Sequence, residues 1–144
     1  MSAQILPSMR ALQAALDRFD RQAATRMGLG RNDAAALRLL VEHGPATPAA
    51  IMAELAITSG SVTALLDRLE RAGLAHRRAH ESDRRSLVVE ASEAGRGACE
   101  QAFAPLGHLT GKLAARMDDA RGQAVTRQLD NLSRLVNWAS GAAS

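Results

Sequence analysis

The sequence is poor in aromatic residues, which make up 2% of its 144 positions: it has no tyrosine, two phenylalanines and one tryptophan. Small aliphatic side chains must therefore fill the interior, and this favours closely packed helices. The length suits one domain, or a small lobe with an oligomerisation arm, and excludes a pair of separate enzymes.

Cysteine occurs once, at Cys99, so the chain can form no internal disulfide. This usage is typical of an intracellular protein. No apolar run approaches the roughly 20 residues of a membrane span, and the N-terminus lacks the apolar stretch of a signal peptide. We therefore expect a soluble, cytoplasmic protein with no membrane partner. Since Glu100 stands beside Cys99, a buried filler thiol is favoured over a redox switch.

Motifs of catalysis and metal binding are missing too. The sequence has no glycine-rich phosphate loop, nucleophile elbow or paired-histidine helix motif, so we expect a protein that is not an enzyme. His76 and His80 have no cysteine or carboxylate set nearby to complete a zinc site. We expect no metal and no cofactor.

Lysine is also scarce: Lys112 is the sole one, and arginine supplies the rest of the positive charge in a chain of net charge +3. Between positions 67 and 85, six arginines and two histidines accompany four carboxylates. Guanidinium forks suit phosphates and guanine edges. A solvated charged face is the alternative interpretation of such a stretch.

Apolar residues near both ends recur at alternating spacings of four and three, which is typical of a narrow stripe along a helix. A chain of this size has little to cover two such stripes, so they predict a symmetric dimer, with a monomer of mutually packed helices as the alternative. The expected interface consists of Ile5, Met9, Leu12, Leu16 and Phe19 with Val125, Leu129, Leu132 and Val136.

Two capping threonines mark a pair of short helices in the middle of the chain. Thr47 precedes a proline at the first helical position, and Thr58 precedes a helix over 59–72. A tight turn joins them, which predicts a helix-turn-helix. A helix that starts at Asn32 and Asp33 and ends at His43 is expected before this pair.

Residues 74–79 and 85–91 favour strands, and the segment between them is polar and turn-like. This predicts a β-hairpin with a charged tip, placed where a winged-helix domain has its wing. Ser92 is expected to cap a following helix, which Pro105 should kink. A break near residues 117–119 is expected before a last helix.

Three stretches resemble the MarR family of winged helix-turn-helix transcriptional regulators: Thr-Ser-Gly-Ser-Val-Thr at 58–63, Leu-Asp-Arg-Leu-Glu-Arg-Ala-Gly-Leu at 66–74, and Asp-Arg-Arg-Ser at 83–86. The resemblance covers essentially the whole chain. It implies a mainly α fold with a small β-hairpin wing, in which the terminal helices form a dimerisation region. The implied domains are an N-terminal dimerisation helix (1–27), a winged helix-turn-helix DNA-binding domain (28–92) and C-terminal dimerisation helices (93–144).

The resemblance also implies that the helix beginning at Ser59 enters the major groove, while Arg85, oriented by Asp83, reaches the minor groove. A helix N-terminus presents free N–H groups to phosphate, and small residues allow close approach. Ordinary helix capping is the alternative role of Ser59 and Ser61. The predicted DNA-binding residues are Thr58, Ser59, Gly60, Ser61, Thr63, Arg68, Arg77, Asp83, Arg84 and Arg85.

Ala64 and Leu65 depart from the family pattern, because many relatives carry arginine or asparagine there, so direct base readout is expected to be thin. The expected function is that of a dimeric, sequence-specific regulator of double-stranded DNA, a repressor that responds to a small-molecule effector. The alternative is a winged-helix protein-interaction module without DNA binding. With Phe19, Phe103 and Trp138 as the only aromatic residues, the sequence does not locate an effector pocket.

Overall fold

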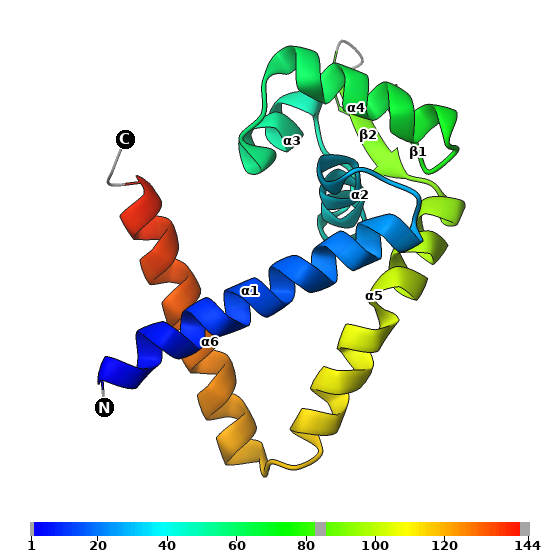
Figure 1. Cartoon of the computed structure of the whole chain (residues 1–144). Helices are drawn as coiled ribbons and strands as arrows, with labels where there is room; N and C mark the ends of the chain where they lie inside the picture. Colours follow the sequence, from blue (N-terminus) through cyan, green and yellow to red (C-terminus); the bar gives the residue numbers. More distant parts are fainter. Residues whose placement is uncertain (1, 83–85, 142–144) are drawn as a thin grey trace. The chain divides into compact units, whose positions relative to one another are not determined.

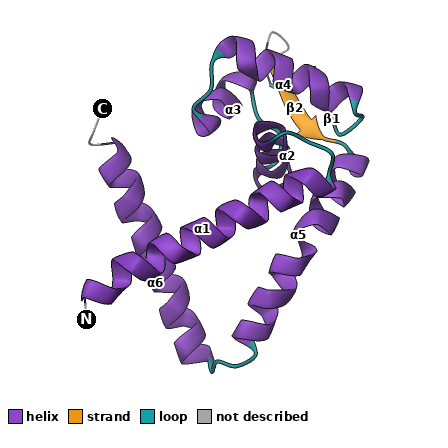
Figure 2. Ribbon diagram, viewed as in Figure 1, coloured by secondary structure: helices purple, strands orange, loops and turns teal. Residues whose placement is uncertain are grey.

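The computed structural model describes residues 2–82 and 86–141, so the predicted wing-tip contacts Asp83, Arg84 and Arg85 lie outside the described residues. The chain divides into two compact units, Met1–Phe103 and Ala104–Ser144. Helices dominate the described part and a single hairpin accompanies them, as the sequence predicts (Figures 1 and 2). In chain order the elements are α1 (Ser2–Arg26), α2 (Arg31–His43), α3 (Pro48–Leu55), α4 (Ser59–Arg71), β1 (Ala75–Ala79), β2 (Leu87–Ala91), α5 (Glu93–Ala114) and α6 (Asp119–Gly141).

The core of the first unit is built from α2, α3, α4 and β2. Its large, completely buried side chains are all aliphatic, in keeping with the scarcity of aromatic residues: Leu37, Leu40, Ile51, Leu65, Leu66, Leu69 and Val89. The three leucines of α4 are spaced at one and three residues, so they line one side of the helix. This fixes which side of α4 faces solvent.

The wing is a two-stranded antiparallel sheet in which Ala75 pairs with Ala91 and Ala79 pairs with Leu87. Val89 also exchanges two backbone hydrogen bonds with Ala46, at 2.8 and 3.0 Å, so the segment before α3 extends the sheet by one bridge. The β1 strand packs beside α4 (Figure 1). The hairpin is therefore anchored at its base to the core.

The start of α2 differs from the expectation. The helix begins at Arg31, and Gly30 occupies the capping position without a side-chain hydrogen bond. Asp33 is not a cap: it lies in the first turn, where it is buried. An ionised side chain in that position requires a partner, and Arg68 provides it.

The second unit contains the end of α5 and all of α6. The α5 helix continues through Pro105 as one element, and a break at residues 115–118 precedes α6. Between residues 104 and 141 no described side chain is buried. The apolar stripe of α6 is thus not buried within the second unit.

A membrane span is not among the described single helices, since none is both long enough and apolar enough. The bent pair of α3 and α4 passes that test jointly, by length and composition.

Candidate nucleic-acid interface

The helix-turn-helix consists of α3, a turn at Ala56 and Ile57, and α4. Thr47 caps α3 as predicted, because its hydroxyl accepts the N–H of Ala50 at 3.2 Å. Ala56 adopts the left-handed conformation at φ +51°, which turns the chain sharply. The two helices are bent by 112° relative to each other, within the range typical of helix-turn-helix motifs.

The first turn of α4 is capped by Thr58, which confirms that prediction. The Thr58 hydroxyl accepts the backbone N–H of Ser61 at 3.2 Å and donates to the Ser61 hydroxyl at 2.8 Å. No acidic residue lies in this turn. A helix N-terminus carries partial positive charge, so this end of α4 is suited to an anion.

All five predicted contacts at this end are exposed: Thr58, Ser59, Gly60, Ser61 and Thr63. A Cβ built on Gly60 would meet nothing within 4 Å, so packing does not require a glycine there. Ala64 is also exposed, whereas Leu65 is buried in the core and cannot read a base. The accessible surface of the turn is small, uncharged and rich in hydroxyl groups.

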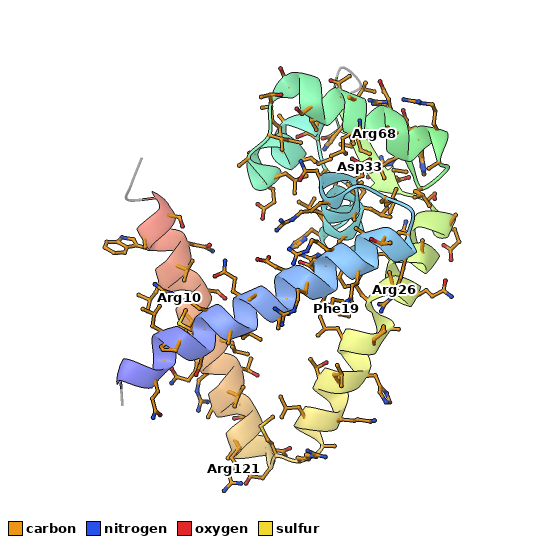
Figure 3. The ribbon with its side chains drawn as sticks, viewed as in Figure 1. Arg10, Phe19, Arg26, Asp33, Arg68 and Arg121 are labelled. Carbon is orange, nitrogen blue, oxygen red and sulfur yellow. The ribbon has the colours of Figure 1, made fainter. Side chains whose placement is uncertain are left out.

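Arg68 lies two turns further along α4 and forms a bidentate ion pair with Asp33 of α2 (Figure 3). Its Nε donates to Oδ2 at 2.8 Å and its Nη2 donates to Oδ1 at 2.7 Å. The Asp33 side chain is 7% exposed and that of Arg68 is 50% exposed. The hydrogen bonds to Asp33 raise the pKa of Arg68. Sequence reasoning misses this pair, because its members are 35 positions apart.

Arg77 of β1 also forms ion pairs, in this case with side chains of α4. Its guanidinium contacts both Glu70 and Asp67 of α4, with an Nη2–Oδ1 distance of 2.9 Å to Asp67. Its backbone N–H donates to Glu70 at 2.9 Å. The DNA contacts predicted for Arg68 and Arg77 remain predictions, but both side chains hold α4 in this structure.

A third cluster lies on the hairpin around Glu90. Its carboxylate accepts Arg78 Nε at 2.9 Å and lies 2.7 Å from His76 Nε2. The hydrogen bond from Arg78 lowers the pKa of Glu90, and the bond from His76 adds to this effect against partial burial. Much of the charge in the arginine-rich stretch is therefore compensated locally.

Cys99 is buried, as expected for a filler thiol. Burial raises its pKa, and the nearby Glu42 carboxylate raises it further, although Arg38 acts in the opposite direction. Among the described residues no group of three or more His, Cys, Asp or Glu side chains could hold a metal ion.

A hollow of about 140 Å³ lies in the first unit, lined by Asp20, Arg31, Ala34, Ala35, Arg38 and Phe103. Arg38 lies over the ring of Phe103, 5.3 Å from its centre, and Phe19 packs against the same ring at 5.6 Å. The sequence does not locate this hollow, because its lining comes from three separate helices.

The predicted dimer residues form two uncovered stripes. Six are exposed, with exposed fractions from 39% to 53%: Ile5, Leu12, Leu16, Val125, Leu129 and Val136. Met9, Phe19 and Leu132 are half-buried.

Comparison with known proteins gives matches over the helix-turn-helix and the wing. The model of the MarR family matches residues 27–86. This region is therefore similar to the MarR family. The HTH-type transcriptional regulator YcgE of Bacillus subtilis is 36% identical over 92 residues, which are 64% of this chain and 60% of YcgE. YwhA, another HTH-type transcriptional regulator of that species, is 37% identical over 65 residues, 45% of this chain and 47% of YwhA. The matches thus span less than two thirds of either relative.

Solved MarR-type structures share the fold over a longer stretch. A MarR family protein from Bacillus stearothermophilus has a TM-score of 0.76 at 21% identity, covering 94% of this chain and 95% of its own. A MepR mutant from a multidrug-resistant clinical isolate of S. aureus has a TM-score of 0.73 at 17% identity, covering 89% and 94%. The predicted winged-helix fold is confirmed, and the family and relatives are transcriptional regulators, not enzymes.

Proposed function

We propose that this MarR-type chain is a dimeric, sequence-specific regulator that binds double-stranded DNA and acts as a repressor. The observation that carries the proposal is the N-terminal turn of α4, which is capped by Thr58, free of acidic residues and lined by exposed small hydroxyl side chains. Its opposite side is anchored in the core. Such a turn can approach phosphates and base edges closely.

A solved relative supports DNA as the partner. Another mutant of S. aureus MepR was crystallised with an oligodeoxyribonucleotide, and this chain matches it with a TM-score of 0.61 at 18% identity. In a winged helix, the recognition helix occupies the major groove and reads base edges there. We assign that role to α4.

The dimer is proposed from the two uncovered apolar stripes on α1 and α6. Each stripe is continuous along its helix, and a stripe this long is costly to leave in water. Replacing Leu12 and Leu132 together with glutamate should dissociate or unfold the protein. Sedimentation at micromolar concentration measures this, and a folded monomer of the unaltered chain would contradict the dimer.

The hollow beside Phe103 is the place we propose for a small aromatic effector. Arg31 and Arg38 line it together with the Phe103 ring, so an aromatic acid would find both a stacking surface and cationic groups. Asp20 occupies one wall and already bonds Arg38 at 3.1 Å. An acidic ligand would compete with it for that arginine.

The test of DNA binding is a Ser61→Glu variant, assayed on a duplex that the unaltered protein selects from a random-sequence library. Glu at this position completes a capping box with Thr58, so the helix should be as stable as before or more so. The new carboxylate would face phosphate, so affinity should fall by about tenfold or more. Ser133→Glu, an exposed site on α6, adds the same charge outside the helix-turn-helix and should bind normally. Unchanged affinity of Ser61→Glu would show that α4 does not enter the groove.

The internal pairing of Arg68, Arg77 and Arg78 favours one competing function, a winged-helix module that binds protein. A protein-binding module predicts a different result, because the unaltered chain would then enrich no duplex from the random-sequence library. The same selection decides between the two functions.

A further inference from the structure

The face of α4 that carries Ser61 also carries Arg68, seven residues and two helical turns further on. By position alone, Arg68 would be expected to bind the DNA backbone. In the structure its guanidinium is instead committed to Asp33, with two nitrogens donating to the two carboxylate oxygens at 2.7 and 2.8 Å (Figure 3).

We propose that Arg68 is a positioning residue of the recognition helix and not a phosphate contact, an inference that rests on the proposed DNA-binding function. The pair with Asp33 fixes the rotation of α4 about its own axis. It thereby sets the direction in which Ser61 and its neighbours face the groove.

The burial of Asp33 is the first reason. Its side chain is 7% exposed, so an arginine that turned away to reach phosphate would leave a carboxylate in the core without its counterion. A buried ionised carboxylate without a partner is strongly disfavoured. The buried Asp33 carboxylate therefore keeps the Arg68 guanidinium in the ion pair.

The geometry of the pair is the second reason. Leu65, Leu66 and Leu69 determine which side of α4 faces the core, but apolar contacts are not directional and leave small rotations of the helix possible. The bidentate pair is directional, because both nitrogens of the fork must meet both oxygens. On the wing side, Arg77 links β1 to Glu70 and Asp67, so α4 is held from both flanks.

The two possible roles of Arg68 predict opposite changes in DNA affinity when its acidic partner Asp33 is removed. If Arg68 binds phosphate, Asp33→Asn frees its charge and affinity for any duplex stays equal or rises. If Arg68 positions α4, Asp33→Asn misaligns the helix and lowers affinity for the selected duplex. Asp17→Asn is the matched control, because it removes an exposed partner of Arg31 with the same change of charge.

The experiment measures binding of the unaltered dimer and of Asp33→Asn, Arg68→Gln, Arg68→Lys and the Asp33→Asn/Arg68→Gln double variant. The probes are a selected duplex of about 30 base pairs, long enough for two half-sites one turn apart, and a scrambled duplex of equal length. Salt titrations and thermal melts of each variant accompany the binding curves. Arg68→Lys keeps the charge and loses the fork, so it separates the two roles even if Asp33→Asn does not fold.

We expect each single variant to bind the selected duplex about tenfold more weakly, with the double variant no worse than either, since coupled partners are not additive. Affinity for the scrambled duplex and the slope of affinity against salt should stay unchanged. The inference is overturned if Asp33→Asn binds as well as the unaltered protein, or if Arg68→Gln alone reduces the salt slope by about 1, the signature of one lost phosphate contact. If the unaltered chain selects no duplex, the proposed function fails and takes this inference with it.

Discussion

Two glycines near the start of α5 should respond to alanine with opposite signs. A Cβ on Gly95 would overlap the carbonyl oxygen of Leu74 and lie 3.0 Å from Cδ1 of Leu37. A Cβ on Gly97, two residues further on, would meet nothing within 4 Å. The same substitution in the same helix therefore tests how closely α5 approaches the turn that follows α4.

The loss of unfolding free energy expected for Gly95→Ala follows from the displacement of α5 that the new Cβ requires. A carbon–oxygen contact needs about 3.3 Å, so α5 must retreat from Leu74 by about 1 Å. That retreat breaks the Ser92 N–H bond to the Leu74 carbonyl (2.9 Å) and the Ser92 hydroxyl bond to the Gly73 carbonyl (2.7 Å). Two hydrogen bonds contribute about 2 kcal/mol and overpacking costs about 1–3 kcal/mol, against a gain of about 1 kcal/mol in helix propensity. Gly95→Ala should lose about 2–4 kcal/mol of unfolding free energy.

Urea denaturation monitored by circular dichroism measures both variants at constant protein concentration. Gly97→Ala should gain about 0.5–1 kcal/mol, because it contributes helix propensity without a clash. If Gly95→Ala is as stable as the unaltered protein, α5 does not pack against the turn after α4 as described.

Three further predictions concern single sites. Ala56→Gly should raise stability by about 0.5–1 kcal/mol in a thermal melt, because relief of a left-handed alanine exceeds the added freedom of the unfolded chain; a lower melting temperature would contradict this. Arg78 lowers the pKa of Glu90, so their pair stabilises the fold above the ordinary glutamate pKa of about 4.3, and this stabilisation is lost as pH falls through the lower folded value. The Glu90→Gln variant should therefore lose less stability than the unaltered protein on acidification to about pH 3. An acid profile that the substitution leaves unchanged would argue against the pair. Cys99 should react with a thiol reagent slowly in the native protein and rapidly in urea, because burial raises its pKa, whereas fast native labelling would show an accessible thiol.

The capped helices are predictable because their signals are local. Thr47 with Pro48, and Thr58 before a run of apolar residues at helical spacing, specify helix starts from a few neighbouring positions. The buried side of α4 follows from the same periodicity. The wing strands are predictable to within about two residues for a similar reason, since the β-branched Val88 and Val89 of β2 follow a polar turn.

The ion pairs are not predictable, because they join residues that only the folded chain brings together. Sequence patterns assign Asp33 to a helix start, and they leave its partner Arg68 and the β1 residue Arg77 as free cations. The amino-acid composition gives the number of charged residues but does not show which of them form ion pairs in the folded chain. The hollow at Phe103 escapes prediction on the same grounds, since α1, α2 and α5 each supply part of its lining.

The most direct test of DNA binding through α4 is a hydroxyl-radical footprint of the unaltered protein on its selected duplex. A two-fold dimer that inserts two α4 helices should protect two segments centred about 10 base pairs apart, one helical turn. Ser61→Glu should lose both protections together at the same protein concentration. Uniform cleavage with the unaltered protein, or a single protected segment that Ser61→Glu leaves intact, would contradict the account.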